Sequence, residues 1–211
     1  MSATSLTQPT MISILWPASS AQPWLRNVIL AIAGSLFVAA SAQIQVPMWP
    51  VPFTGQTFAV LVVGMAYGSR LGAATLALYM IEGAVGLPVF SKFAAGYGVL
   101  LGPTGGYIAG FVLAAGLVGY LAERGWDRTF WQTALAMLAG NVVIYLPGLL
   151  WLTNFFAGLG PEAIQSNGAQ TAFGAALLAG ATPFLLGDLI KLILAAICLP
   201  LAWHVLSKKR S

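Results

Sequence analysis

The chain has 211 residues, of which 59% are hydrophobic and 7% are charged, and its net charge is +4. So few charges exclude a soluble domain of this size, and the small positive excess gives no indication of nucleic-acid binding. Long apolar runs with 24 glycines and 12 prolines are typical of an all-α protein that crosses a membrane several times.

Residues 1–25 precede the first long apolar run. They are rich in serine and threonine and contain Pro9, Pro17 and Pro23, so they do not resemble a cleavable signal peptide. We expect a flexible cytoplasmic leader whose residues 11–16 touch the membrane interface. The membrane domain is expected at residues 26–206 and a basic cytoplasmic tail at residues 207–211.

Six apolar stretches predict six transmembrane helices, since a helix needs about 20 residues to cross the hydrocarbon core and fewer where it is enclosed by others. Their predicted ranges are 26–44, 57–67, 71–85, 104–121, 130–154 and 184–206. We expect irregular loops at 45–56, 86–103 and 155–183, the last with a short helix over 171–181 that enters the membrane.

The basic residues predict the orientation of these helices. Six spans place seven of the nine on one side: Arg26, Arg70, Arg124, Arg128, Lys208, Lys209 and Arg210. The positive-inside rule assigns this side to the cytoplasm. Both termini are therefore predicted to be cytoplasmic, and the three long loops are predicted to lie on the outer face.

Asp188 and Lys191 are ionisable residues within the last apolar stretch. An ionisable group at membrane depth costs a few kcal/mol, so such residues usually serve a function. Their i,i+3 spacing places both side chains on one helix face, one to two turns below the predicted outer surface. The pattern favours a polar ligand site, and the alternative is a structural ion pair that tightens helix packing.

Two of the predicted outer loops carry further candidates. Thr54 and Gln56 follow Pro50 and Pro52, and Thr54 is either an N-cap of the second span or a ligand contact. Glycines before Tyr107 permit a ligand or another backbone to approach a helix start, whose free amides favour an anionic or carbonyl group. The alternative is close helix packing through small residues.

Four motifs resemble the BioY family in order and spacing, over residues 26–206. They are Pro52-x-Thr54-x-Gln56-Thr57, Gly86-Leu87-Pro88-Val89-Phe90, Gly102-Pro103-Thr104-Gly105-Gly106-Tyr107 and Gly187-Asp188-x-x-Lys191. The chain departs from the family pattern at Gly55, where leucine is frequent, and at Lys92 and Phe93 within a usually glycine-rich loop. The resemblance implies a six-helix biotin-binding S component of an energy-coupling factor transporter, in the plasma membrane of a prokaryote.

The resemblance also implies roles for the candidate residues. Asp188, an acceptor when ionised, suits the ureido N–H groups of biotin, and Lys191 suits the ureido carbonyl or stabilises Asp188. Thr54 and Gln56 would add neutral hydrogen bonds. Phe90, Tyr107 and Trp49 are candidate apolar walls. Lys92 departs from the family pattern, and we choose it as the candidate for the carboxylate because it is the only cation in a predicted outer loop; the alternative is a solvated loop lysine. Asn141 and Tyr145, at i,i+4 in the middle of the fifth predicted span, either reach the cavity or bond a neighbouring helix.

The implied partners are membrane lipid, a transmembrane coupling protein (EcfT-type) and a pair of ATPases (EcfA-type). We assign docking of the coupling protein to Ala31, Ser35 and Ala39, a stripe of small residues on the first span. Packing within the chain is the alternative. The sequence leaves a homo-oligomer open.

Three other functions are weighed against biotin binding. An S component for thiamin or riboflavin is disfavoured by the Asp188–Lys191 pair and by the motifs. An intramembrane enzyme would need a nucleophile–base pair or metal ligands, and the sequence supplies no suitable set. The sequence contains one cysteine, Cys198, and one histidine, His204, so we expect neither a disulfide nor a metal centre. We also expect no cofactor. A structural scaffold would bind no ligand.

Overall fold

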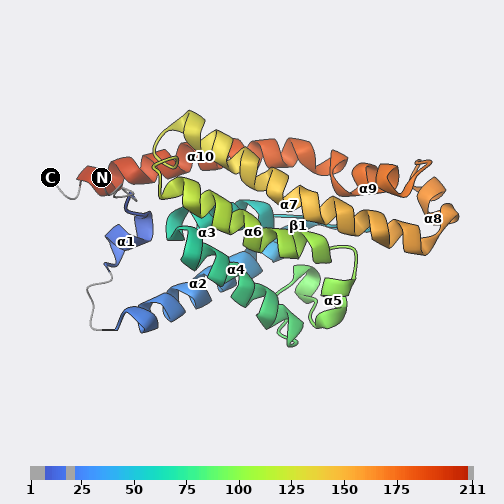
Figure 1. Ribbon diagram of the computed structural model, residues 1–211, viewed down its shortest axis with the longest axis horizontal. Helices are drawn as coiled ribbons and strands as arrows, with labels where there is room; N and C mark the ends of the chain where they lie inside the picture. The colour runs from blue at the N-terminus through green and yellow to red at the C-terminus, as the bar shows by residue number, and fades with distance from the viewer. Residues whose placement is uncertain (1–7, 18–21, 209–211) are drawn as a thin grey trace, which may run out of the picture.

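A computed structural model describes residues 8–17 and 22–208 of the chain as a bundle of helices elongated along one axis (Figure 1). Parts of the expected leader (1–7 and 18–21) and of the expected tail (209–211) lie outside the described residues. The described part of the leader contains a short helix, α1 (Met11–Leu15).

Each of the six apolar stretches forms a helix. These helices are α2 (Pro23–Gln43), α3 (Gln56–Tyr67), α4 (Ser69–Ala84), α6 (Gly105–Ala122), α7 (Phe130–Leu159) and α10 (Leu185–Lys208). Their directions alternate in Figure 1: α2, α4 and α7 run away from the end that holds α1, and α3, α6 and α10 run back toward it.

Four segments of the described chain are long and apolar enough to cross a membrane. They are Pro23–Gln43, Gly105–Ala122, Phe130–Leu159 and the continuous stretch Ala172–Lys208. Gln56–Tyr67 is apolar but shorter. The protein is therefore an all-helical, polytopic membrane protein, in which the shorter helices α3 and α4 pack against α6 and α2.

The centre of the bundle is α6, which packs against α7, α4 and α3. Small residues permit this close packing: Ala114 and Ala115 are fully buried. Gly119 illustrates the constraint, because a Cβ atom there would lie 2.4 Å from the carbonyl carbon of Gly68. A larger residue at this position would force α6 away from the turn between α3 and α4.

The loops are more ordered than the sequence predicts. Residues 45–56 contain a two-stranded antiparallel ribbon, β1 (Gln45–Val46) with β2 (Phe53–Thr54). The other two loops contain η1 (Ser91–Phe93), α5 (Tyr97–Leu101), α8 (Pro161–Ser166), α9 (Ala172–Gly180) and η2 (Thr182–Phe184). The expectation of irregular loops at 86–103 and 155–183 was thus wrong in part, whereas the short helix near 171–181 is confirmed.

Two local features explain the helices within residues 155–183. Pro161 occupies the first turn of α8, where a missing N–H costs no hydrogen bond, so this proline starts a helix. Thr171 caps α9 by accepting a hydrogen bond from the Gly174 N–H at 3.1 Å.

The preceding helix α7 also continues past Pro147 to Leu159, further than its predicted end.

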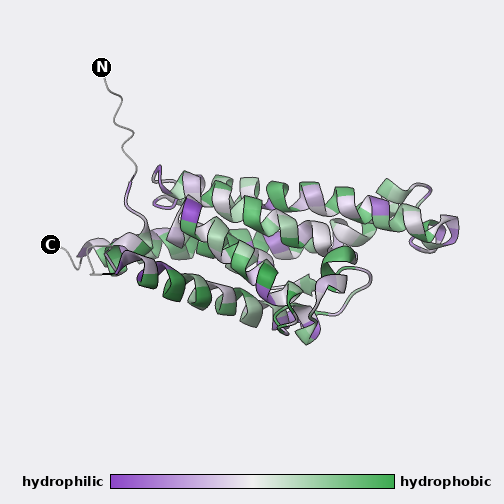
Figure 2. Ribbon diagram, turned by 60° about the horizontal axis from the view of Figure 1, so that its bottom comes forward, coloured by the Kyte–Doolittle hydropathy of each residue, from purple (hydrophilic) through white to green (hydrophobic). Residues whose placement is uncertain are grey.

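Basic residues gather at the end of the bundle that holds α1, called the basic end below. Arg26 donates hydrogen bonds to the carbonyl oxygens of Trp16 (2.6 Å) and Ile12 (3.0 Å), which fixes α1 beside α2. Arg26 and Arg70 line one hollow. Strongly hydrophilic segments lie mostly toward the two ends of the bundle, and hydrophobic residues cover the sides of the helices (Figure 2).

A buried aspartate lies in the loop between α6 and α7 at the basic end. Asp127 is fully buried, and its Oδ2 accepts a hydrogen bond from Nε1 of Trp203 on α10. Its Oδ1 has no hydrogen-bond partner among the described residues. Burial raises the pKa of the Asp127 carboxyl above its usual range, because this effect exceeds the opposing hydrogen bond from Trp203.

Candidate functional site

A cavity of about 510 Å³ lies at the other end of the bundle, in the size range of small-molecule sites. Its walls come from the β1–β2 ribbon, from the starts of α3, α6 and α10, from the middle of α7 and from the segment between α4 and α6. Segments far apart in the sequence thus surround one space, and two of the three predicted loop regions, 45–56 and 86–103, contribute to it.

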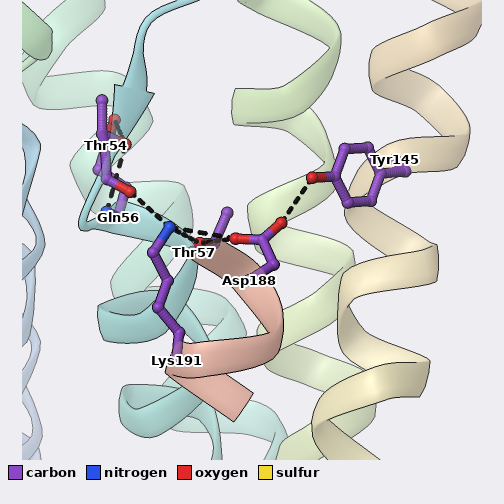
Figure 3. A network of polar contacts seen from close by, with 6 residues as sticks. All are labelled: Thr54, Gln56, Thr57, Tyr145, Asp188 and Lys191. Carbon is purple, nitrogen blue, oxygen red and sulfur yellow. Dashed lines mark hydrogen bonds and ion pairs between the residues drawn. The ribbon is translucent and has the colours of Figure 1, made fainter. Parts of the chain in front are cut away.

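Asp188 and Lys191 form an ion pair at this cavity, with 3.1 Å between Lys191 Nζ and Asp188 Oδ1. Both residues line the cavity, and Asp188 is only 5% exposed. The pair lies in the first two turns of α10, where i,i+3 spacing brings the side chains together as predicted. The pair and its partners are drawn in Figure 3.

The Lys191 ammonium uses all three of its N–H donors. Besides Asp188, it donates to the carbonyl oxygen of Thr54 at 2.7 Å and to Thr57 Oγ1 at 2.9 Å. It also lies 4.0 Å from the centroid of the Phe53 ring, an attractive cation–π arrangement. Lys191 is therefore saturated by the chain itself.

The Asp188 carboxylate accepts two hydroxyl hydrogen bonds in addition to the ion pair. Thr57 donates to Oδ1 at 3.0 Å, and the Tyr145 hydroxyl donates to Oδ2 (Figure 3). A carboxylate offers about four lone-pair positions. Lys191, Thr57 and Tyr145 occupy three of them, which leaves one acceptor position on Oδ2.

Thr54 and Gln56 belong to a neighbouring network beside the ion pair. The Gln56 amide nitrogen donates to the Tyr79 hydroxyl at 2.8 Å, and its oxygen accepts from Thr54 Oγ1 at 3.1 Å. Tyr79 in turn donates to the carbonyl oxygen of Val89 at 3.0 Å. Both predicted residues line the cavity, and their polar atoms are largely engaged within the chain.

The predicted apolar walls are present. Phe90, Tyr107 and Trp49 all line the cavity. Phe90 is held edge-on against Tyr79 with ring centroids 5.5 Å apart, and the Tyr107 hydroxyl donates to the carbonyl oxygen of Gly180 at 2.8 Å. These contacts fix aromatic rings around the space that the ion pair faces.

Lys92 also lines the cavity, in the turn between α4 and α5. Its backbone and that of Phe93 adopt left-handed conformations, with φ of 60° and 56°. Among the described residues, none forms a hydrogen bond or ion pair with the Lys92 ammonium. Lys92 is thus an exposed lysine at the cavity, without a hydrogen-bond or ion-pair partner among the described residues.

The structure does not bring Asn141 into the cavity. Asn141 is 8% exposed and is not part of the lining, although Tyr145, one turn further along α7, is. Its Oδ1 has no hydrogen-bond partner among the described residues. For Tyr145 both expected possibilities hold, since it lines the cavity and also donates to Asp188 on the neighbouring helix α10. Sequence reasoning gave no role to Thr57. Two sequence features indicate these residues. Thr57 is part of one of the four motifs, and Tyr145 places a hydroxyl group in the middle of an apolar span.

The stripe of small residues on α2 faces α4 rather than the surface. Ser35 is fully buried and donates to Glu82 Oε1 on α4 at 3.1 Å, while Ala31 and Ala39 are half-buried. Packing within the chain accounts for these contacts. The docking role of the stripe stays a prediction.

The cavity has the chemistry of a binding site. Among the described residues, no group of three or more His, Cys, Asp or Glu side chains lies close enough together to hold a metal ion. One wall offers a carboxylate acceptor, aromatic rings form the others, and a free ammonium lies in the Lys92 turn. This arrangement fits a small ligand with N–H donors at one end, an apolar body, and an anionic group.

The sequence profile of the BioY family matches residues 9–208. The biotin transporter BioY of Thermotoga maritima is 38% identical over 173 residues, 82% of this chain and 93% of that protein. The probable biotin transporter BioY of Pyrococcus horikoshii is 38% identical over 166 residues, 77% of this chain and 89% of that protein. The biotin transporter BioY of Rhizobium etli is 32% identical over 179 residues, 81% and 88% of the two chains.

The fold is also similar to a solved structure. The crystal structure of an S-component for biotin from an ECF-type ABC transporter superposes with a TM-score of 0.65 and covers 87% of this chain and 93% of that chain. At 20% sequence identity this likeness establishes the fold.

Proposed function

The chain belongs to the BioY family, and from this premise we propose that it is the high-affinity biotin-binding subunit of a vitamin uptake transporter. It captures biotin and performs no chemistry on it. The observation that carries the proposal is the largely buried Asp188–Lys191 pair, which lines a half-open cavity of small-molecule size with aromatic walls.

The geometry supports separate roles for the two charged residues. Asp188 Oδ2 retains one acceptor position, which suits a ureido N–H of biotin. Lys191 has no free donor, so a ligand carbonyl would have to displace Thr54, Thr57 or Asp188 from it. We therefore favour Lys191 as the residue that keeps Asp188 ionised and oriented. A charge-assisted bond to the buried Asp188 would discriminate sharply between biotin and analogues without the N–H.

The other parts of biotin can be assigned to the remaining walls of the cavity. Phe90, Tyr107 and Trp49 would enclose the bicyclic ring and the valerate chain, with Thr54 and Gln56 beside the ureido group. Lys92, which has no partner in the described chain, would bind the carboxylate. Asn141 would act on the cavity only through its neighbours on α7.

The proposed topology has six membrane crossings with both termini in the cytoplasm. Six helices of alternating direction support it, as do Arg26 and Arg70 at the basic end, opposite the cavity. The cavity would then open toward the outer face of the plasma membrane of a prokaryote.

Uptake would proceed with a transmembrane coupling protein and ATPases as energising partners, in keeping with the ECF-type transporter named for the similar structure. Ala31, Ser35 and Ala39 remain our proposed docking stripe. Since Ser35 is buried against α4, docking there would require α2 to separate from α4.

The test is equilibrium binding of biotin to the purified chain in detergent, with Asp188→Asn measured beside the wild type. We expect nanomolar binding by the wild type and a loss of about 3 kcal/mol, or more than a hundredfold, in the variant. Asp127→Asn is the matched control, because it neutralises another buried aspartate at the basic end. Absence of binding by the folded wild type would refute the biotin assignment, and normal binding by Asp188→Asn would return the pair to a structural role.

A further inference from the structure

The turn that carries Lys92 has an unusual backbone. Lys92 (φ 60°, ψ 29°) and Phe93 (φ 56°) are consecutive non-glycine residues in the left-handed region. Side chains with a Cβ atom disfavour this region, and two in succession persist only where the surroundings hold them. The turn therefore needs an external restraint.

One amide side chain bridges the two ends of this turn. Gln43 is the last residue of α2, and its Nε2 donates to the carbonyl oxygen of Phe90 at 3.0 Å. Its Oε1 accepts a hydrogen bond from the backbone N–H of Phe93 at 3.2 Å. The same Nε2 lies 3.3 Å from the carbonyl oxygen of Ala39, which orients the amide on its own helix.

A second glutamine acts beside the first. Gln45 begins β1, and its Oε1 accepts a hydrogen bond from Ser91 Oγ, the residue before Lys92. The two glutamines flank Ile44, so the junction between α2 and β1 holds the turn at three of its residues. Within the turn itself, the Phe90 N–H donates to the carbonyl oxygen of Ala94 at 3.1 Å.

The two glutamines do not line the cavity, whereas Phe90, Ser91 and Lys92 do. Any effect of the glutamines on a ligand must therefore pass through the turn. Since the Lys92 ammonium is unpartnered among the described residues, the backbone of the turn sets the point and direction from which its side chain extends.

We infer that Gln43 and Gln45 are positioning residues that hold the Lys92 turn in its left-handed conformation and thereby give the site its preference for ligands with a carboxylate. This inference rests on the proposed function and deepens it. It predicts that removing an amide outside the cavity changes which ligand is preferred, as well as how tightly ligands bind.

The experiment compares the affinities of biotin and of biotinamide, which lacks the negative charge, for the full-length chain in detergent. Lys92→Ala should lower the ratio of biotin to biotinamide affinity by about tenfold. Gln43→Leu, which removes the amide at nearly constant volume, should lower the same ratio by roughly threefold to tenfold. In the double variant the ratio should fall no further than in Lys92→Ala. Both changes act on the same interaction, that between the Lys92 ammonium and the ligand carboxylate.

The matched control is Gln132→Leu, since Gln132 is exposed and accepts a hydrogen bond only from nearby Thr129 at the basic end. It should leave the ratio unchanged. If Gln43→Leu does not fold, Gln45→Leu tests the same inference and should lower the ratio in the same direction.

The outcomes separate the inference from the function on which it rests. A Gln43→Leu variant that weakens both ligands equally, or neither, while Lys92→Ala lowers the ratio, would overturn the positioning role alone. An unchanged ratio in Lys92→Ala would overturn both the carboxylate role and this inference. Biotin binding that depends on Asp188 would remain established in either case.

Discussion

Tyr145 on α7 donates a hydrogen bond to the carboxylate of Asp188 on α10, two residues 43 positions apart in the sequence. The bond ties two helices together at the wall of the cavity. It also occupies one lone pair on Oδ2, the oxygen that retains room for a ligand N–H. The orientation of the carboxylate toward a ligand is therefore set from α7 as well as by Lys191.

Tyr145→Phe should weaken biotin binding by about 1 kcal/mol, or roughly fivefold in Kd, because it removes one hydroxyl and leaves the ring in place. Equilibrium binding in detergent measures this change. Tyr120→Phe is the matched control, since Tyr120 is half-exposed on α6, where it contacts Arg124 near the basic end. Equal affinity of wild type and Tyr145→Phe would show that the hydroxyl does not orient Asp188.

Thr57→Val should reduce biotin affinity by about tenfold, since it leaves one Lys191 donor and one Asp188 acceptor unsatisfied in a buried site. Thr57→Ser keeps the hydroxyl and should bind nearly as the wild type does. The two variants are compared by titration with biotin. If valine and serine behaved alike, the hydroxyl would not be the part of Thr57 that matters.

Lys191→Met should destabilise the protein by about 3 kcal/mol, because it leaves Asp188 as an uncompensated buried charge. Adding Asp188→Asn to this variant should restore much of the stability, since the charge is then removed, but should not restore biotin binding. Thermal unfolding in detergent and binding on the same samples separate the two effects. A double variant no more stable than Lys191→Met would contradict this account.

Asp127→Asn should stabilise the protein at neutral pH, since burial raises the pKa of Asp127 in the folded chain above its unfolded value. The folded state then binds the proton more tightly, so wild-type stability falls as pH rises through the window between the two values. Below the pKa of Asp127 in the unfolded chain, the carboxyl is protonated in both states, and burying it no longer costs stability. Thermal unfolding of both proteins from acidic to neutral pH should show a gap that opens with rising pH, and a constant gap would refute this explanation.

The helices were predictable because their signal is local. Apolar length located α2, α6, α7 and α10, and the two shorter helices were separated by a break near Gly68, which is the one residue between α3 and α4. The β1–β2 ribbon was not predictable, because its two-residue strands are specified by pairing with each other rather than by their own composition. Pro161 was interpreted as part of a loop, although proline is equally suited to the first turn of a helix.

The site was predictable where one helix determines the contact. Asp188 and Lys191 meet because of their i,i+3 spacing on α10. Tyr145 and Asn141 lie on neighbouring turns of α7, and which of them reaches the cavity depends on how α7 packs against α10, which no local pattern fixes. The link from Gln43 to the Lys92 turn spans 47 to 50 positions and was invisible for the same reason.

The saturation of Lys191 by Thr54 and Thr57 bears on how the protein is made. Both threonines are synthesised more than 130 residues before Lys191. The hydrogen bonds that satisfy the ammonium of α10 therefore come from a part of the chain that already exists when α10 is made.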